Sequence, residues 1–191
     1  MVLLTGPSGA GKSSLARHLV RTGWTHLDGD QLAKSLYKPS SRLLAAMVGI
    51  FGRRILREDG FLDAHALGEI VFSSPARLKA LNRLVYPSFL RALRREIRAA
   101  KAHGLRLVAD VPVYFDLGAP DLGLPVVLVT APLVQRIARL KAMGLSPRRA
   151  GQRARSLHFG AAERGRADLV IDASKAPSQA RAALQRFLRT A

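Results

Sequence analysis

The chain of 191 residues contains no cysteine, and its five histidines are scattered without the spacing of metal ligands. The lack of cysteine excludes disulfides, thiolate nucleophiles and zinc sites built on sulfur. The dispersed histidines favour surface or capping roles over metal binding. We therefore expect no resident metal site built from cysteine or histidine.

Long apolar runs are also missing. No run reaches the roughly 18 residues that a membrane helix needs. The chain opens with Met1–Thr5 and enters a glycine-rich loop at once, without the basic lead-in of a signal peptide. These absences predict a cytoplasmic protein that has no membrane partner.

Acidic residues are scarce, because 13 Asp and Glu stand against 31 Lys and Arg, for a formal net charge of +18. Such a surplus attracts anions, whether nucleotides, nucleic acids or acidic membranes. Solvated surface arginines explain the same number, since charge runs usually mark exposed faces. Aromatic residues make up only 6% of the chain and no nucleic-acid motif is recognisable, so we expect no specific nucleic-acid partner.

Short apolar segments alternate with helical patterns along the chain. The predicted strands cover residues 2–4, 25–28, 105–109, 125–130 and 168–171. Helical periodicity fills most of residues 31–103, where Pro87 is predicted to open a helix, and it returns at 133–143 and 179–188. This alternation predicts one three-layer α/β domain over residues 1–191, built around a parallel five-stranded sheet.

The most specific local motif is a phosphate-binding loop. Residues 6–13, Gly-Pro-Ser-Gly-Ala-Gly-Lys-Ser, fit the pattern G-x-x-x-x-G-K-[ST] between a predicted strand and a predicted helix. In this motif backbone N–H groups surround the β-phosphate, the lysine reaches the β- and γ-phosphates, and the hydroxyl binds Mg²⁺. The predicted ATP contacts are Gly9, Ala10, Gly11, Lys12, Ser13 and Ser14, with Ser13 as the Mg²⁺ ligand. The motif indicates a P-loop nucleotide-binding fold.

Among P-loop proteins, the sequence favours small-molecule kinases. A guanine-recognition [NT]-K-x-D element and the signatures of motor ATPases are absent from the chain. Asp28 and Asp30 follow the second predicted strand, at the sheet edge where ligands bind in parallel α/β folds. One carboxylate could contact the metal shell and the other the acceptor hydroxyl, whereas capping of the next helix is the alternative role. For Asp28 both roles stay open, and for Asp30 we favour chemistry, as the general base.

Five further segments resemble the dephospho-coenzyme A kinase family, and the resemblance runs almost end to end. The matching segments are Leu27–Asp30, Phe51–Asp63, Ile70–Pro75, Asp110–Asp116 and Arg166–Asp172. The resemblance implies transfer of the ATP γ-phosphate to the 3′-hydroxyl of dephospho-CoA, with ATP and Mg²⁺ as cofactors. It also implies Asp30 as base, Lys12 stabilising the transferred phosphate, and Asp110 facing the acceptor or the magnesium shell.

The same resemblance divides the domain into functional parts. A nucleotide-binding core is expected over about 1–30, 104–143 and 167–191. An acceptor-binding helical insertion is expected over about 31–103, and a lid over about 144–166. Arg139, on the helix that leads into the lid, is expected to contact an ATP phosphate, and the protein is expected to act as a monomer.

Four positions depart from the family pattern. Tyr86-Pro87 stands where the family usually has His-Pro, and Lys34 replaces an arginine, which keeps the charge but loses bidentate geometry. Met143 lies where a second lid arginine is missing, and Leu157 lies at the glutamine position of the lid. Lys34 and Tyr86, with Asp28 and Asp110, are still the predicted acceptor contacts. Two alternatives therefore stay open: a kinase acting on another hydroxyl, such as that of a nucleoside, or a nucleotide-binding protein with a degenerate acceptor site.

Overall fold

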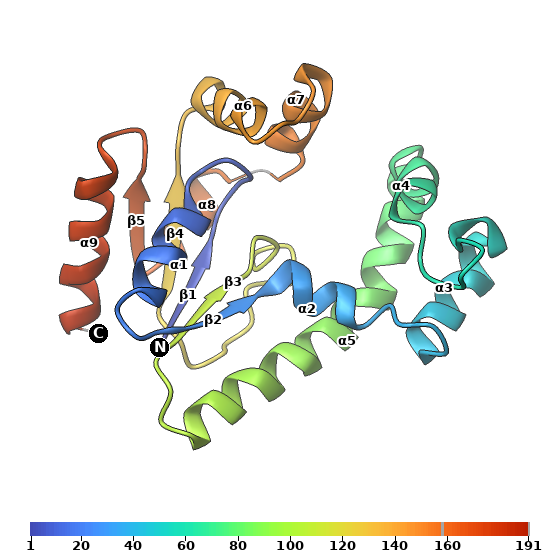
Figure 1. Cartoon of the computed structure of the whole chain (residues 1–191), viewed down its shortest axis with the longest axis horizontal. Coiled ribbons are helices and arrows are strands. Elements are labelled where there is room, and N and C mark those ends of the chain that lie inside the picture. The colour runs from blue at the N-terminus through green and yellow to red at the C-terminus, as the bar shows by residue number, and fades with distance from the viewer. Residues whose placement is uncertain (158, 191) are drawn as a thin grey trace. The chain divides into compact units, whose positions relative to one another are not determined.

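The computed structural model describes residues 1–157 and 159–190 (Figure 1). The chain divides into two compact units. Residues 1–29 and 99–191 form the sheet unit, and residues 30–98 form the helical unit. His158, in the predicted lid, and Ala191, in the predicted core, lie outside the described residues.

The sheet unit contains a five-stranded sheet in which every pair of neighbours is parallel. The strand order is β2-β3-β1-β4-β5. The strands are β1 (Val2–Thr5), β2 (Thr25–Asp28), β3 (Leu107–Asp110), β4 (Val126–Thr130) and β5 (Leu169–Asp172). The predicted parallel sheet is thereby confirmed, with small shifts at the strand ends.

The strand positions follow from burial. Val2, Leu3 and Leu4 of β1 are fully buried, as expected for a central parallel strand covered on both faces. Each such aliphatic side chain stabilises the fold by roughly 1.5–3 kcal/mol. The prediction that β3 begins at Leu105 is wrong, because Leu105 is 45% exposed and the strand begins two residues later.

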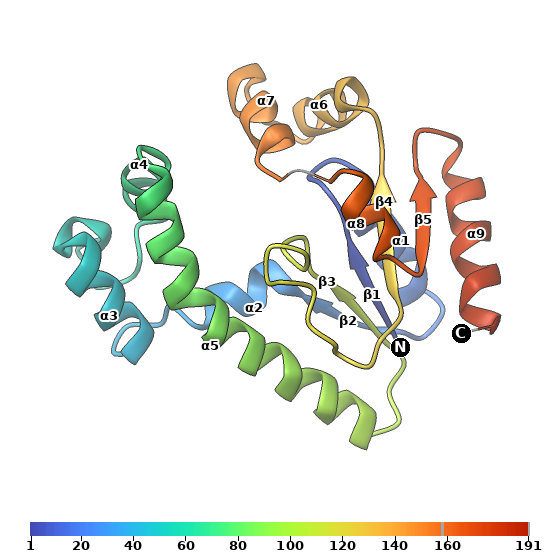
Figure 2. The ribbon, with the colours of Figure 1, turned by 180° about the vertical axis from the view of Figure 1, so that it is seen from behind.

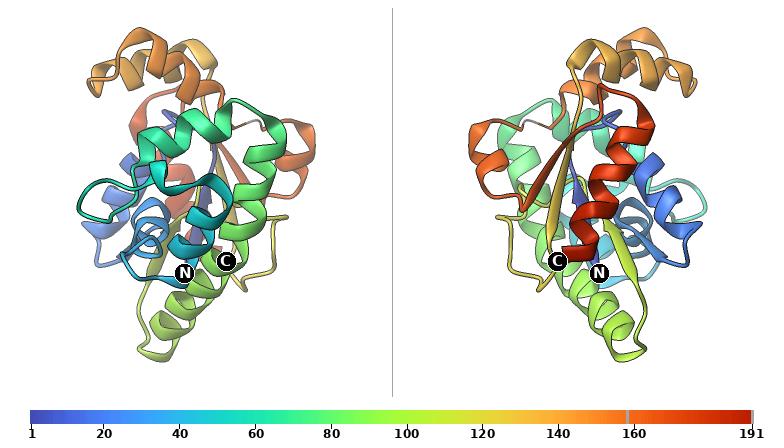
Figure 3. Two further views of the ribbon diagram at one scale, coloured as in Figure 1. Left: turned by 90° about the vertical axis from the view of Figure 1, so that its right-hand side faces the viewer. Right: turned by 90° about the vertical axis from the view of Figure 1, so that its left-hand side faces the viewer.

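Helices cover both faces of this sheet. The helices of the sheet unit are α1 (Lys12–Val20), α6 (Leu133–Ala142), α7 (Pro147–Arg155), α8 (Ala161–Gly165) and α9 (Pro177–Thr190), and α6 and α7 lie beyond the ends of the strands (Figure 1). Helices α1 and α9 lie on one face, whereas α8 and the segment 111–125 lie on the other (Figures 1 and 2). Figure 3 shows α9 running beside β5 on the way to the C-terminus. Trp24 is buried in the core of this unit, and the guanidinium carbon of Arg106 lies 4.8 Å from its ring centre.

The helical unit consists of helices that pack around their own apolar core. They are α2 (Gly29–Ser35), α3 (Arg42–Phe51), the 3-10 helix η1 (Arg53–Ile55), α4 (Ala64–Phe72) and α5 (Pro75–Ala102) (Figure 3, left). The boundaries between the two units fall within α2 and α5. Met47, Phe51, Ile55, Ile70 and Val71 form the centre of the core.

The prediction that Pro87 opens a helix is wrong. Pro87 lies inside α5, which is continuous from Pro75 to Ala102. Proline lacks the N–H for one helical hydrogen bond. However, Val85, Phe89 and Leu93 recur at helical spacing across this point and are all buried. We infer that this continuous apolar face offsets the lost bond.

Of the helices in the described part of the chain, none is long and apolar enough to cross a membrane. Within residues 1–157 and 159–190 there is also no group of three or more His, Cys, Asp or Glu side chains placed to hold a metal ion.

Candidate functional site

The loop between β1 and α1 has the backbone that anion binding needs. Gly6 and Gly9 have φ of 133° and 78°, in the region that L side chains rarely adopt. A Cβ atom at Gly6 would lie 2.1 Å from the carbonyl oxygen of Val129, and one at Gly9 would lie 2.6 Å from that of Arg136. Both positions therefore require glycine. The loop leads into the N-terminus of α1, which has no acidic residue in its first turn and so favours an anion.

Lys12 is folded over this loop. Its side chain is 7% exposed, and Nζ donates hydrogen bonds to the carbonyl oxygens of Gly6 at 2.8 Å and Pro7 at 3.3 Å. Ser13, in the first turn of α1, is exposed, and Ser14 is half-buried. The ammonium of Lys12 is thus held by carbonyl groups of the loop itself. Its contact with phosphate and the Mg²⁺ ligation by Ser13, which the motif implies, stay predictions.

Arg139 of α6 is tied to the same loop. Its Nη1 donates to the carbonyl oxygens of Gly9 at 3.3 Å and Ala10 at 3.2 Å. Its Nη2 donates to the carbonyl oxygen of Ala173, after β5, at 2.6 Å. Arg139 therefore joins the phosphate loop to the β5–α9 connection, and its expected contact with ATP stays a prediction.

Two carboxylates meet at the carboxyl edge of the sheet. Asp28 ends β2 and Asp110 ends β3, and the two residues are partners in the strand register. Asp110 is also in register with Leu4 of β1, the strand that enters the phosphate loop. Asp110 is 9% exposed and Asp28 is half-buried. The parallel sheet thus brings together the phosphate loop and both acidic residues, as the sequence predicts.

Three other predicted residues belong to the helical unit. Asp30 is exposed in the first turn of α2, and Lys34 is exposed in its last turn. Tyr86 of α5 is half-buried and lines a groove of about 510 Å³ together with Lys79 and Arg83. The expected role of Asp30, as the general base for an acceptor hydroxyl near the γ-phosphate, stays a prediction.

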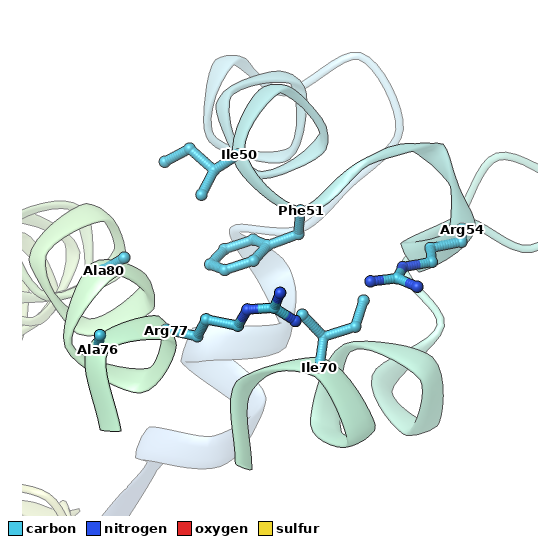
Figure 4. Close-up of a pocket in the computed structure, with 7 residues that line it drawn as sticks. All are labelled: Ile50, Phe51, Arg54, Ile70, Ala76, Arg77 and Ala80. Atoms are coloured by element: carbon cyan, nitrogen blue, oxygen red, sulfur yellow. The ribbon is translucent and has the colours of Figure 1, made fainter. Parts of the chain in front are cut away.

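The helical unit also contains a pocket that the sequence did not indicate (Figure 4). It has a volume of about 260 Å³, and apolar side chains, including Phe51 and Ile70, form much of its wall. The guanidinium groups of Arg54 and Arg77 lie on either side of Ile70 (Figure 4). A neighbouring pocket of about 430 Å³ shares these two arginines. The combination of an apolar wall with two cations suits an anionic ligand that carries an apolar part.

The predicted lid segment is more ordered than a basic loop. Residues 147–155 form α7, whose Ala150 and Ala154 pack against Leu140 of α6. Met143, which follows α6, is 73% exposed, and Leu157 is half-buried. Helix α7 thus places several exposed arginines next to the helix that holds the phosphate loop.

Most of the chain is similar in sequence to known kinases. The family model described as Dephospho-CoA kinase matches residues 1–178. The dephospho-CoA kinase of Corynebacterium diphtheriae is 36% identical over 173 residues, which cover 90% of this chain and 86% of that protein. The dephospho-CoA kinase of Streptomyces avermitilis is 41% identical over 143 residues, which cover 73% of this chain and 69% of that protein.

Solved structures are similar to this chain in fold. The crystal structure of TT1252 from Thermus thermophilus has a TM-score of 0.79 and 30% identity, covering 99% of this chain and 95% of that one. Shikimate kinase from Acinetobacter baumannii shares the fold, with a TM-score of 0.52 and 18% identity. The match covers 99% of this chain and 90% of that one. The family match and the relatives together lead to one conclusion: this chain belongs to the dephospho-CoA kinase family.

Proposed function

We propose that this protein transfers the γ-phosphate of ATP to the 3′-hydroxyl of dephospho-CoA, giving coenzyme A and ADP. The observation that carries the proposal is the phosphate loop with Lys12 folded over it, next to the paired Asp28 and Asp110. Phosphoryl transfer needs chiefly positioning and charge stabilisation, and a loop of backbone N–H groups with one lysine supplies both.

Each side chain has a proposed role in this reaction. Lys12 leaves the carbonyl groups of Gly6 and Pro7 to bind the β- and γ-phosphates, and so stabilises the charge on the phosphate in transfer. Asp30 accepts the proton of the acceptor hydroxyl. Arg139 contacts ATP phosphate from α6.

The residues at the sheet edge fit a Mg²⁺ ion that arrives with ATP. Mg²⁺ prefers oxygen ligands, and it usually keeps waters and substrate phosphates in its shell. The exposed Ser13 hydroxyl is the proposed protein ligand, and Asp28 and Asp110 are placed at the same edge of the sheet for the outer shell. The ion supplies neutralisation of charge between the phosphates.

The helical unit is the proposed site for the acceptor. Dephospho-CoA carries a diphosphate and an extended, partly apolar arm. The pocket between Phe51 and Ile70, with Arg54 and Arg77 at its sides, offers both cations and apolar contact. Lys34 and Tyr86 are the other proposed acceptor contacts, and residues 144–166 are the proposed lid over ATP. We further propose that the enzyme works as a monomer in the cytoplasm.

One assay tests the activity. Purified protein is incubated with Mg-ATP and dephospho-CoA, and the formation of ADP and CoA is followed by chromatography. We expect equal amounts of both products, and Lys12→Ala should lower both ATP affinity and turnover. Parallel reactions with adenosine and uridine test the alternative acceptors that the Lys34 and Tyr86 substitutions leave open. Turnover of a nucleoside alone would refute the proposed acceptor, and ATP binding with no product from any acceptor would refute transfer altogether.

A further inference from the structure

Arg136 lies in α6, three residues before Arg139, and no feature of the sequence separates it from the other arginines. Its side chain is half-buried, and burial lowers the pKa of its guanidinium. The group still carries its charge, because an arginine does not lose its proton in proteins. A partly desolvated cation has to be compensated by good hydrogen bonds.

The guanidinium makes two such bonds, both to backbone carbonyl groups. Nε donates to the carbonyl oxygen of Ala131 at 3.0 Å, directly after β4. Nη1 donates to the carbonyl oxygen of Ala154, in the last turn of α7. The last four carbonyl groups of a helix have no partner within that helix, and a cation there also interacts favourably with the helix dipole. Arg136 therefore caps the C-terminal end of α7 from a neighbouring helix.

The backbone of the same residue touches the phosphate loop. Gly9 approaches it so closely that an added Cβ would lie 2.6 Å from the Arg136 carbonyl oxygen and 3.1 Å from its Cβ. One residue thus contacts the loop, the exit of β4 and the end of α7. The apolar contact between α6 and α7 centres on Leu140, Ala150 and Ala154, and the partly buried Leu133, Ile137 and Leu145 pack against them. The charged cap adds a directional contact to this apolar packing, at the C-terminal end of α7.

We propose that Arg136 is a positioning residue that docks α7 beside the phosphate loop. Its role is to present the basic face of α7 to the triphosphate. The arginines of that helix are Arg148, Arg149, Arg153 and Arg155. The inference rests on the proposed binding of ATP in the loop, but its first test needs no nucleotide.

Hydrogen–deuterium exchange of the free protein is that test. Arg136→Met keeps the length of the aliphatic stem and removes the donors. We expect amides of residues 147–155 to exchange about three- to tenfold faster, the size expected when a helix loses a C-terminal cation. Arg186→Met is the matched control, because Arg186 is an exposed arginine of α9 and the charge change is the same. Unchanged exchange in α7, or faster exchange spread evenly over the sheet unit, would overturn the inference.

Steady-state kinetics distinguish a role of Arg136 in positioning α7 from a role in the stability of the fold alone. In Arg136→Met we expect KM for ATP to rise about three- to tenfold while kcat falls less, because a displaced lid weakens nucleotide binding before it affects the chemistry. Arg136→Lys should restore part of the affinity, since an ammonium can still donate to the Ala154 carbonyl. A wild-type KM in Arg136→Met, or no rescue by lysine, would overturn the proposal. If the wild type makes no CoA, the proposed function fails, and the exchange experiment still decides the role of Arg136.

Discussion

Asp30 is the first charged side chain after β2, and it is exposed in the opening turn of α2. We expect Asp30→Asn to keep wild-type affinity for ATP and to lower kcat about 10²- to 10⁴-fold, the usual contribution of a positioned base. Steady-state kinetics with dephospho-CoA and a separate nucleotide titration check the two parts. Asp28→Asn is the comparison, because Asp28 lies two residues away in the same segment. Wild-type kcat in Asp30→Asn would remove the base assignment.

At the level of single residues, a role could be predicted from the sequence where it depends on neighbouring residues in the chain, and not where it depends on tertiary contacts. The phosphate-loop residues follow from one contiguous motif. The convergence of Asp28 and Asp110 follows from a general rule, that parallel strands end at one edge. Arg136 could not be found, because its bonds to Ala131 and Ala154 are set by how α6 packs on α7. Nothing in its sequence neighbourhood distinguishes a capping arginine from a solvated one.

Helix α4 depends on one carboxylate at its start. Asp63 Oδ1 accepts hydrogen bonds from the backbone N–H groups of His65 at 2.8 Å and Ala66 at 3.0 Å. The bond from Ala66 is the largest cause that lowers the pKa of Asp63. A depressed folded-state pKa stabilises the protein above the unfolded-state pKa, and this contribution is lost as pH falls through the folded-state pKa.

We therefore expect Asp63→Ala to lower the melting temperature at neutral pH, and to lower it less in acid. Asp63→Asn should keep most of the wild-type stability, because asparagine is an equally good helix cap. It should also lose part of the acid sensitivity. Thermal melts followed by circular dichroism from about pH 3 to 7 span the relevant carboxylate range. Glu58→Gln, at an exposed carboxylate, is the control. Equal melting of Asp63→Ala and wild type at neutral pH would contradict the assignment.

The pocket formed by α3, η1, α4 and α5 supports a prediction about the acceptor. We expect Arg77→Met to raise KM for dephospho-CoA about three- to tenfold with little change in KM for ATP, as for the loss of a charged contact to one substrate. Arg94→Met is the matched control, since Arg94 is an exposed arginine of the same helix and does not line the pocket. An equal effect of both variants would show that general charge, and not the pocket, matters.

The elements themselves were largely predictable, and the errors have physical reasons. Buried strands are short and apolar, so β1 and β4 stand out in the sequence. The start of α5 was predicted wrongly at Pro87, because proline is common in the first turn of a helix. Here Pro87 lies inside α5, on a helix whose buried face is continuous. The same continuity hides the boundary between the units, since α5 runs through residue 98 without a break.

The net charge of +18 belongs to the molecule as a whole. If most arginines are solvated, binding to single-stranded RNA should be weak and should fall steeply with salt, because each phosphate contact releases counterions. We expect fluorescence anisotropy with a short labelled RNA to detect binding at low salt and little at about 0.15 M, where the Debye length is about 8 Å. Tight binding that persists at the higher salt would instead support a nucleic-acid function.

Trp24 has a practical consequence for any study of how this molecule comes apart. It is the single tryptophan of the chain, and it is buried in the sheet unit under the Arg106 side chain. Its fluorescence therefore reports unfolding of the sheet unit and not of the 69 residues between Gly29 and Ala99. Far-ultraviolet circular dichroism, in contrast, reports the helices of both units. A denaturant curve that differs between the two signals would reveal separate unfolding of the helical unit, and coincident curves would mean that both units unfold together.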